Sequence, residues 1–294
     1  MGEGNLPPVS TAADRIVDVT DPTDARLGDY LGLREATLRR PHARFIAEGP
    51  LVVRRAVEAG YPAESFLLTP RWVDELRDVW QVTAAPVYRA STAVVEAITG
   101  FHVHRGALAA LRRSERWSVD QVLAGDRVVV VEDLVDHANL GTIIRSTAAL
   151  GWDGLLVTHG SADPLYRRAV KTSMGAVFSL PWARLAAGAD LMNHLRGAGF
   201  TVVALAPGHA GVDLATARQR LGLTISGASG RPAPADPAPA RAPNRLAVLL
   251  GSEGPGLSRP LIEGADLVVT IPMAHGIDSL NVAAAAAIAC FALR

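Results

Sequence analysis

The sequence has one cysteine and one lysine, and the shortage of cysteine excludes several kinds of protein. Cys290 stands alone among 294 residues, so the chain can form neither an internal disulfide nor a thiolate-rich metal cage. This composition is typical of a protein kept in a reducing compartment, and we expect a cytoplasmic protein. Lys171 is the only lysine, and every other basic residue is an arginine.

Long apolar runs and an excess of charge of one sign are also absent. No uncharged apolar run reaches the roughly 18 to 20 residues that a transmembrane helix needs, and the best candidate, 282–293, is too short. Twenty-nine basic residues balance 29 acidic residues, so contact with a polyanion would need a local basic patch. Hydrophobic residues make up 49% of the chain and charged residues 20%, a balance that allows a folded core.

The chain divides into a tail and two domains by its patterns of apolar residues. Residues 1–14 are small, acidic and proline-containing, without the basic start and apolar block of a signal peptide, and we expect a flexible tail. Short β-type runs then alternate with amphipathic stretches, which predicts a small α/β domain over 15–117. A polar stretch surrounds the expected boundary near Trp117, and the second domain spans 118–294.

The second domain alternates apolar strands with helical patterns. Strands are predicted at RVVVVED, GLLVT, TVVALAP, LAVLLG and DLVVTIP, and helices over 140–150, 164–174, 190–198 and 280–293. Such alternation predicts a parallel sheet with helices on both faces, which binds ligands beyond the carboxyl ends of its strands. Residues 226–244 contain mostly Pro, Ala, Gly and Ser, and predict a disordered surface insertion.

Two of the loops that follow predicted strands carry residues able to support chemistry. In the first loop, Asn139 occupies a plausible helix N-cap, Gly141 permits close backbone approach, and Arg145 lies on the first turns of the helix. A capped helix with a solvated arginine explains the same pattern. In the second loop, GSEGPG, three glycines surround Glu253 and indicate either a tight turn or a backbone that a ligand approaches. The spacing matches neither a dinucleotide fingerprint nor a Walker loop.

The third loop joins the last predicted strand to an alanine-rich helix. Its strand ends at residues 271–273, and Ser279 or Asp278 is expected to cap the helix, with Asn281 as a further short polar group at the helix start. Capping residues before a tightly packed helix are a sufficient structural explanation by themselves. All three loops nevertheless follow strands of one predicted sheet.

The order and wording of the three loops bear a family resemblance. Asn139-x-Gly141-x-x-x-Arg145, then GSEGPGLS, then IPM with DSLNVAAA resembles the three motifs of the SpoU (also called TrmH) branch of the SPOUT RNA ribose methyltransferases. Residues 163–182 also look like that family. The first domain resembles the family's ribosomal-protein-like, RNA-binding substrate domain.

The resemblance implies a fold, a cofactor and a set of site residues. The second domain would be a SPOUT domain with a C-terminal trefoil knot, and the protein would be a homodimeric RNA 2′-O-methyltransferase that uses S-adenosylmethionine. The residues implied to contact the cofactor are Leu205, Gly251, Glu253, Ile271, Met273 and Leu280. The residues implied in catalysis are Arg145, which would activate the ribose hydroxyl, with Asn139, Glu253, Ser279 and Asn281.

The role implied for Arg145 leaves two mechanisms open. An arginine with a pKa of about 12 or above seldom acts as a base. Arg145 would either lose its proton transiently in a dry site, or hold the neighbouring phosphate while another group or water takes the proton. A further departure from the family pattern is His137, which stands where a proline is common and is either an accessory acid or base or an exposed loop residue.

Basic residues suggest where RNA would bind. Arg167, Arg168 and Lys171 adjoin the predicted sheet and are the preferred phosphate contacts. Two arginine groups of the first domain are equally well explained as solvated surface; they are Arg39, Arg40 and Arg44, and Arg112, Arg113 and Arg116. His102 and His104 lack a third ligand for zinc, and we expect neither a metal nor a membrane partner.

Several functions remain to be weighed. Ribosomal RNA is favoured because a ribosomal-protein-like domain suits a structured hairpin or loop; the alternatives are a tRNA ribose methyltransferase or an antibiotic-resistance rRNA methyltransferase. A non-catalytic RNA-binding protein would leave Arg145 and the glycine loop without a role. A nucleotide-dependent oxidoreductase is disfavoured because no G-x-G-x-x-G follows the first strand of the second domain.

Overall fold

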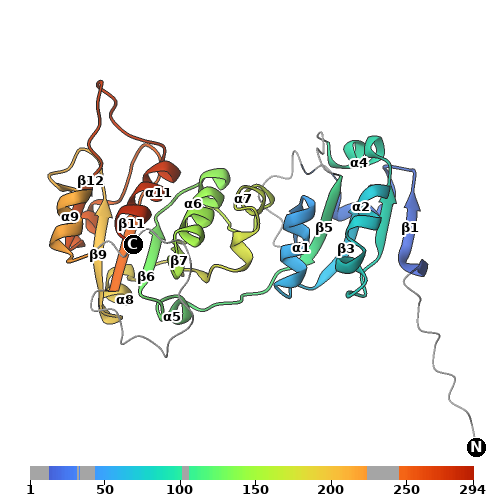
Figure 1. The fold of residues 1–294 in the computed structure, drawn as a ribbon, viewed down its shortest axis with the longest axis horizontal. Coiled ribbons are helices and arrows are strands. Elements are labelled where there is room, and N and C mark those ends of the chain that lie inside the picture. Colours follow the sequence, from blue (N-terminus) through green and yellow to red (C-terminus); the bar gives the residue numbers. More distant parts are fainter. Residues whose placement is uncertain (1–12, 32, 34–43, 101–105, 224–244) are drawn as a thin grey trace, which may run out of the picture. The chain divides into compact units, whose positions relative to one another are not determined.

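The computed structural model describes residues 13–31, 33, 44–100, 106–223 and 245–294 (Figure 1). The chain forms two compact units, Met1–Ser114 and Glu115–Arg294. The boundary predicted near Trp117 falls just inside the second unit. The predicted tail up to residue 12, the predicted insertion over 226–244, Arg39, Arg40 and the histidine pair at 102 and 104 lie outside the described residues.

The first unit contains a five-stranded sheet in the order β1-β4-β3-β5-β2. Its strands are β1 (Ile16–Val19), β2 (Arg44–Glu48), β3 (Ala63–Leu68), β4 (Val87–Ala90) and β5 (Ala107–Arg112). Strands β1, β4 and β3 run parallel, and β5 runs antiparallel to both β3 and β2. Its helices are η1 (Ala13–Arg15), η2 (Ala25–Tyr30), α1 (Pro50–Glu58), α2 (Pro70–Glu75), α3 (Arg77–Trp80) and α4 (Thr92–Thr99). The α/β character predicted for this region is confirmed.

The second unit contains a seven-stranded sheet in the order β10-β12-β9-β11-β6-β7-β8, in which every neighbouring pair is parallel. Its strands are β6 (Arg127–Val131), β7 (Gly154–Val157), β8 (Trp182–Arg184), β9 (Phe200–Leu205), β10 (Val212–Asp213), β11 (Arg245–Leu250) and β12 (Leu267–Thr270). The predicted parallel sheet and its five predicted strands are confirmed. The sequence did not predict β8 and β10, which are too short to show an apolar pattern.

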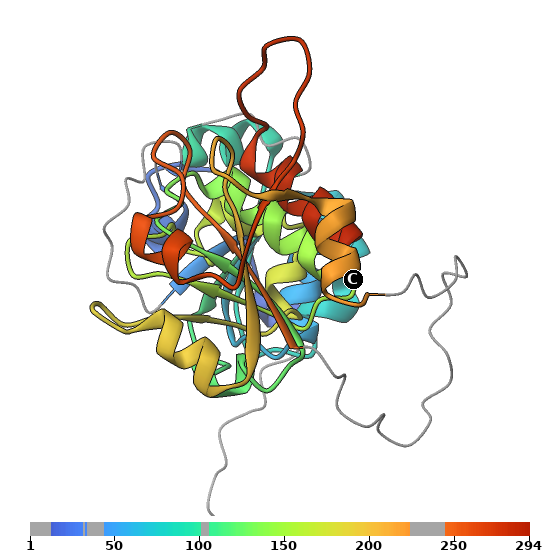
Figure 2. The same ribbon diagram turned by 90° about the vertical axis from the view of Figure 1, so that its left-hand side faces the viewer.

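Helices cover both faces of this sheet (Figure 2). They are α5 (Val119–Val122), α6 (His137–Ala149), α7 (Arg167–Thr172), α8 (Leu191–Gly197), α9 (Leu214–Arg220), α10 (Arg259–Gly264) and α11 (Val282–Ala292), with the 3-10 turn η3 (Ala176–Phe178). Side chains of α5, α8 and α10 share one buried cluster with alternate residues of β6, β9 and β11. Helix α11 packs against α6 and α9 on the other face. Buried valine and leucine therefore fill the sheet from both sides.

Three helices begin or end two or more residues away from their predicted bounds. The helix expected over 164–174 is confirmed only for α7, Arg167–Thr172. Helix α6 starts at His137 rather than residue 140, and α11 starts at Val282 rather than residue 280. The last two shifts follow from the residues that cap these helices, and they bear directly on the site.

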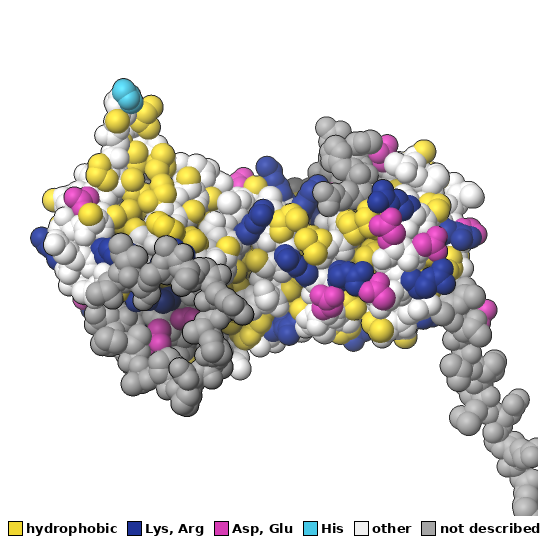
Figure 3. Space-filling view, in the orientation of Figure 1, with side chains coloured by type: hydrophobic (Ala, Val, Ile, Leu, Met, Phe, Trp, Pro, Cys, Tyr) yellow, Lys and Arg dark blue, Asp and Glu magenta, His cyan; other side chains and the backbone are white. Residues whose placement is uncertain are grey.

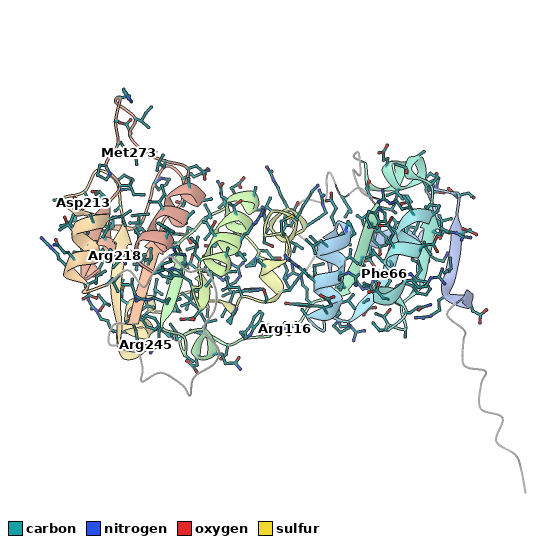
Figure 4. All side chains as sticks on the ribbon, viewed as in Figure 1. Phe66, Arg116, Asp213, Arg218, Arg245 and Met273 are labelled. Carbon is teal, nitrogen blue, oxygen red and sulfur yellow. The ribbon has the colours of Figure 1, made fainter. Side chains whose placement is uncertain are left out.

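Arg245 fixes the amino-terminal end of the sheet of the second unit. Only 7% of this residue is exposed, and its guanidinium donates hydrogen bonds to the carbonyl oxygens of Ala198, Leu123 and Gly125. The guanidinium carbon also lies 4.2 Å from the centroid of the Phe200 ring. Figure 4 shows Arg245 at the end of the sheet opposite to Met273. One side chain thus satisfies three carbonyl groups from two segments, the turn after α5 and the end of α8.

We expect Arg245→Met to lower the free energy of unfolding by about 3 kcal/mol, because it leaves buried carbonyl groups without donors. Arg259→Met is the matched control, since Arg259 is 86% exposed and pairs with Glu263 one helical turn away; it should cost less than about 0.5 kcal/mol. Urea unfolding of both variants measures the difference. Equal losses in the two variants would contradict the role given to Arg245.

Candidate functional site

The loops that carry the predicted site residues leave the same edge of the parallel sheet. Residues 132–136 follow β6, residues 251–258 follow β11, and residues 271–281 follow β12. Figure 1 shows the last of these loops rising above α11 at the carboxyl ends of the strands. Because parallel strands all end at one edge, segments far apart in the sequence meet there.

The first loop ends in a helix cap that frees a predicted site residue. The side chain of Asp136 accepts a hydrogen bond from the backbone N–H of Asn139 at 2.7 Å, so Asp136 is the N-cap of α6. The expectation that Asn139 caps this helix is therefore wrong, because Asn139 lies in the first helical turn. Its side-chain amide instead donates to Oε1 of Glu253.

The second loop is a tight turn. A Cβ atom on Gly251 would collide with the backbone of Gly256 and Leu257, so the two ends of the turn pack backbone against backbone. Gly254 and Gly256 have φ values of 89° and 73°, a region that favours glycine. The N–H of Gly256 also donates to the carbonyl of Ser252 at 3.0 Å. Of the two explanations that the sequence left open, the tight turn is confirmed, and Glu253 lies exposed at its tip.

The third loop ends at Asn281, which caps α11. Its Oδ1 accepts hydrogen bonds from the N–H groups of Ala283 and Ala284, at 2.9 and 3.3 Å. The prediction that Ser279 or Asp278 would cap this helix is wrong. The Nδ2 group of Asn281 points to the other two loops and donates to Oδ1 of Asn139 at 3.0 Å and to Oε1 of Glu253 at 3.4 Å.

Asn139, Glu253 and Asn281 thus form a closed group of hydrogen bonds, which we name the amide–carboxylate cluster. Each residue bonds to the other two, and each comes from a different loop. Two neutral amides hold one carboxylate, which leaves a negative charge at the sheet edge. Three of the residues that the resemblance implied in catalysis are therefore brought together.

Arg145 and Ser279 lie outside the hydrogen bonds of this cluster. Arg145 is six residues beyond Asn139 on α6, which places it about 9 Å further along the helix and roughly 120° around it. Its side chain is exposed on the same helix face as Ala138 and Thr142. Ser279 is exposed in the loop two residues before Asn281.

The strand register places three of the predicted cofactor residues, Leu205, Gly251 and Ile271, at the ends of neighbouring strands. Leu205, the last residue of β9, is paired with Leu250 of β11 and Val269 of β12. Gly251 follows Leu250 directly, and Ile271 comes two residues after Val269. Leu205, Gly251, Ile271 and Met273 are half-buried, and Leu280 is 38% exposed. The surface that these residues offer is apolar, with Glu253 of the cluster next to it in the chain.

Helix α7 carries the predicted RNA contacts and packs closely on α6. A Cβ atom on Gly141 would collide with Thr172 and with the carbonyl of Ala169, which confirms the close backbone approach expected at Gly141. Arg168 and Lys171 are exposed, and Arg167 is half-buried. The three cations lie on one short helix, and no acidic residue occurs between residues 164 and 182.

His137 stacks against Tyr166, the residue before α7. The two ring centroids are 4.0 Å apart and the rings are tilted by 39°. Burial lowers the pKa of His137 below its ordinary value, against the opposing effect of Asp163. His137 is half-buried rather than an exposed loop residue. The sequence showed no sign of a role for Tyr166, because its ring contact is with His137, in a separate segment of the chain.

The first unit offers weaker candidates for RNA contact. Arg44 pairs with Asp29 at 2.7 Å and with Glu64 at 3.6 Å, and Arg112 pairs with Glu64 at 2.5 Å. Figure 3 shows basic and acidic side chains interspersed on this unit. These ion pairs reduce the attraction of Arg44 and Arg112 for phosphate.

Neither a cluster of metal ligands nor a membrane-spanning helix occurs in the described part of the chain. No group of three or more His, Cys, Asp or Glu side chains there could hold a metal ion. None of the described helices combines the length and the apolarity needed to cross a membrane.

Comparison with known proteins gives consistent matches over most of the chain. A sequence model of the SpoU rRNA Methylase family matches residues 126–291. A protein of Mycobacterium bovis named as an uncharacterized tRNA/rRNA methyltransferase is 40% identical over 282 residues, which are 94% of this chain and 91% of that protein.

Solved structures share the fold. The AdoMet-bound rRNA methyltransferase from Sinorhizobium meliloti matches with a TM-score of 0.73 and 26% identity, over 95% of this chain and 98% of that chain. The SpoU methyltransferase AviRb from Streptomyces viridochromogenes matches with a TM-score of 0.70 and 24% identity, over 92% and 96% of the two chains. The second match supports the fold alone.

We expect Gly251→Ala to disrupt the tight turn after β11, because the added methyl group collides with backbone that cannot move away. The free energy of unfolding should fall by more than about 2 kcal/mol. Gly197→Ala is the matched control, since its Cβ would meet nothing within 4 Å and should be neutral or stabilise by up to about 1 kcal/mol. Thermal unfolding compares them. A Gly251→Ala protein as stable as the control would show that the turn is not required to be this tight.

Proposed function

The chain belongs to the SpoU rRNA methylase family, and from this premise we propose that it transfers the methyl group of S-adenosylmethionine to a ribose 2′-hydroxyl of RNA. The observation that carries the proposal is the amide–carboxylate cluster. It joins one residue from each of the three segments that resemble the family motifs. The S. meliloti relative, whose structure contains AdoMet, supports the choice of cofactor.

The sheet edge fits this cofactor. Half-buried Leu205, Ile271 and Met273 offer apolar surface to an adenine ring, and the turn from Gly251 offers backbone rather than a side chain. Glu253 offers a negative charge to the cationic end of the ligand. When bound there, S-adenosylmethionine supplies an electrophilic methyl carbon. The exposed Leu280 would cover the ligand from the start of α11.

Arg145 is proposed to orient the RNA. Its guanidinium is exposed on α6, and an arginine in water keeps its charge. This favours the second of the two mechanisms considered, in which Arg145 holds a phosphate next to the target ribose in a forked, charge-assisted contact. A transient loss of its proton would need a dry site.

The amide–carboxylate cluster is proposed to place the ribose hydroxyl. Asn139 and Asn281 are held by Glu253 and by each other, so their amides cost little further ordering when substrate binds. The exposed Glu253 carboxylate is the group assigned to accept the hydroxyl proton. Ser279 lies on the same loop as Asn281 and would contact the substrate from that side.

The proposed substrate is ribosomal RNA, with tRNA as the alternative. The name of the S. meliloti relative supports rRNA, whereas that of the M. bovis relative covers both classes. Arg167, Arg168 and Lys171 on α7 form the local basic patch that a chain without net charge needs for a polyanion. The first unit is proposed to help select the RNA, in the cytoplasm. A methyltransferase that protects one antibiotic-binding nucleotide would use the same site.

We also propose that the end of the chain forms a trefoil knot and that the protein is a homodimer. The chain passes from β12 back across the sheet to α11, which packs between α6 and α9; this path supports the knot. Ala284, Ile288 and Phe291 form an exposed apolar stripe along α11. Figure 3 shows hydrophobic side chains gathered over this region, and a second copy of the chain is the occupant proposed for it.

Methyl transfer from labelled S-adenosylmethionine to separate pools of unmodified rRNA and tRNA tests the function. We expect label in rRNA at a single position that resists alkaline cleavage, as a 2′-O-methyl group does. Arg145→Ala should reduce transfer at least about 1,000-fold while calorimetry shows cofactor binding within about threefold of wild type, because Arg145 contacts RNA and not the cofactor. Arg145→Lys keeps the charge without the fork and should retain part of the activity.

Other outcomes have definite meanings. Label that does not resist alkali would place the methyl group on a base. Cofactor binding without transfer to rRNA, tRNA or ribosomal particles would favour a non-catalytic RNA-binding protein. Loss of cofactor binding in Arg145→Ala would contradict the role assigned to Arg145.

The dimer has its own test. Ile288→Glu puts a charge into the apolar stripe, and burying an unpaired charge costs several kcal/mol, so the dimer dissociation constant should rise at least about 100-fold. Val82→Glu is the control, since Val82 is 77% exposed in the first unit. Light scattering over a concentration series gives the masses. A monomeric wild-type protein, or a dimer in Ile288→Glu, would refute this interface.

A further inference from the structure

Glu132 is bonded to both ends of the loop that carries Glu253. It follows directly after β6, and its backbone N–H donates to the carbonyl of Leu250 at 2.8 Å. Its side-chain Oε2 accepts from the backbone N–H of Ser258 at 2.6 Å. Leu250 and Ser258 flank residues 251–257, which we name the glycine loop. A single residue therefore closes this loop at both ends.

At the far end of the glycine loop, the backbone N–H of Ser258 is bonded by a residue from outside the loop. Ser258 is the N-cap of α10, yet its side chain makes no capping hydrogen bond. The carboxylate of Glu132, 126 residues earlier in the chain, takes the backbone N–H of Ser258 instead. Hydrogen bonds to an ionised acceptor are about twice as strong as neutral ones, so this contact is the strong one at that end of the loop.

Closing the loop at its base determines where its tip lies. Leu257, next to Ser258, is buried in the core cluster below the sheet. Gly251 packs directly against Gly256, so movement at one end of the loop is passed to the other. Glu253 at the tip then reaches Asn139 and Asn281.

We propose that Glu132 is a positioning residue of the methyl-transfer site. The proposal rests on the proposed function, because it assigns Glu132 the task of presenting the glycine loop to S-adenosylmethionine and of holding Glu253 in the amide–carboxylate cluster. Glu132 acts through the loop and contacts neither cofactor nor RNA. Without its carboxylate the loop samples other conformations, and cofactor binding must then supply the ordering entropy.

Three variants of Glu132 separate the effect of side-chain length from the effect of side-chain charge. Glu132→Gln keeps a carbonyl oxygen at the same distance and can still accept from Ser258. Glu132→Asp keeps the charge but is one methylene shorter, and Glu132→Ala removes the acceptor. Glu263→Ala is the matched control, because Glu263 is 60% exposed on the adjoining helix α10, where it pairs only within that helix with Arg259.

Hydrogen–deuterium exchange reads the loop directly, without cofactor or activity. Glu132→Ala should speed exchange in peptides covering 251–258 at least about tenfold, while peptides of β6 and β11 stay protected. In calorimetry the Kd of Glu132→Ala for S-adenosylmethionine should rise about tenfold, because roughly one charge-assisted hydrogen bond is lost. The exchange rate and the Kd of Glu132→Gln should stay within about threefold of wild type. Those of Glu132→Asp should lie between the values of Glu132→Gln and Glu132→Ala. The control Glu263→Ala should match wild type in both measurements.

The failures are distinguishable. A wild-type protein that binds no S-adenosylmethionine would overturn the proposed function, and the positioning role with it. A wild-type protein that binds the cofactor, with Glu132→Ala equal to it in exchange and Kd, would overturn the positioning role alone. If Glu132→Ala does not fold, the affinities of the other two variants for S-adenosylmethionine decide. Tighter binding by Glu132→Gln than by Glu132→Asp supports the positioning role. Tighter binding by Glu132→Asp than by Glu132→Gln means that the charge of Glu132 acts by another route.

Discussion

The shared direction of the strands in the second unit is the constraint on which the site depends. Every neighbouring pair in its seven-stranded sheet is parallel, so each strand delivers its following loop to the same edge. The register then sets neighbours: Leu205 stands beside Leu250 and Val269. Asn139 and Asn281 are 142 residues apart in the chain, yet Nδ2 of Asn281 lies 3.0 Å from Oδ1 of Asn139. Arg245, at the opposite end of the sheet, holds the strand starts by donating to the carbonyl groups of Ala198, Leu123 and Gly125.

Much of this arrangement could be predicted from the sequence, because its signals are local. Consecutive β-branched residues at β6 and apolar runs at β7, β9, β11 and β12 indicate buried strands, and their alternation with helical patterns predicts the parallel sheet. The helix starts could not be predicted to the residue. Asp136 and Asn139 both suit an N-cap, as do Asp278, Ser279 and Asn281. The choice depends on contacts between α6, α11 and the glycine loop, which local sequence does not contain. Glu132 escapes prediction for the same reason, since an acidic residue after a strand resembles any solvated carboxylate until its partner 126 residues away is known.

Glycine and amide groups give the site order without adding charge. A side chain on Gly251 would collide with the backbone of Gly256, and a side chain on Gly141 would collide with α7. Both glycines therefore allow two segments to pack in close contact. The two asparagines add donors and acceptors but no charge, and the single carboxylate of Glu253 sets the sign of the cluster. Such a site is negative where a cationic cofactor is proposed to lie, and the attraction acts through the exposed Glu253 carboxylate.

Charge is distributed differently where RNA is proposed to bind. The first unit pairs arginines such as Arg44, Arg54, Arg89 and Arg112 with carboxylates, and the chain as a whole has no net charge. Helix α7 carries Arg167, Arg168 and Lys171 within residues 164–182, whose own sequence has no acidic residue. A patch of this size exerts its attraction only within about 8 Å at physiological salt, so it orients an RNA that other contacts have already brought near. Selection of the RNA is then proposed to come from shape and from direct contacts at the surfaces around the site, rather than from long-range attraction.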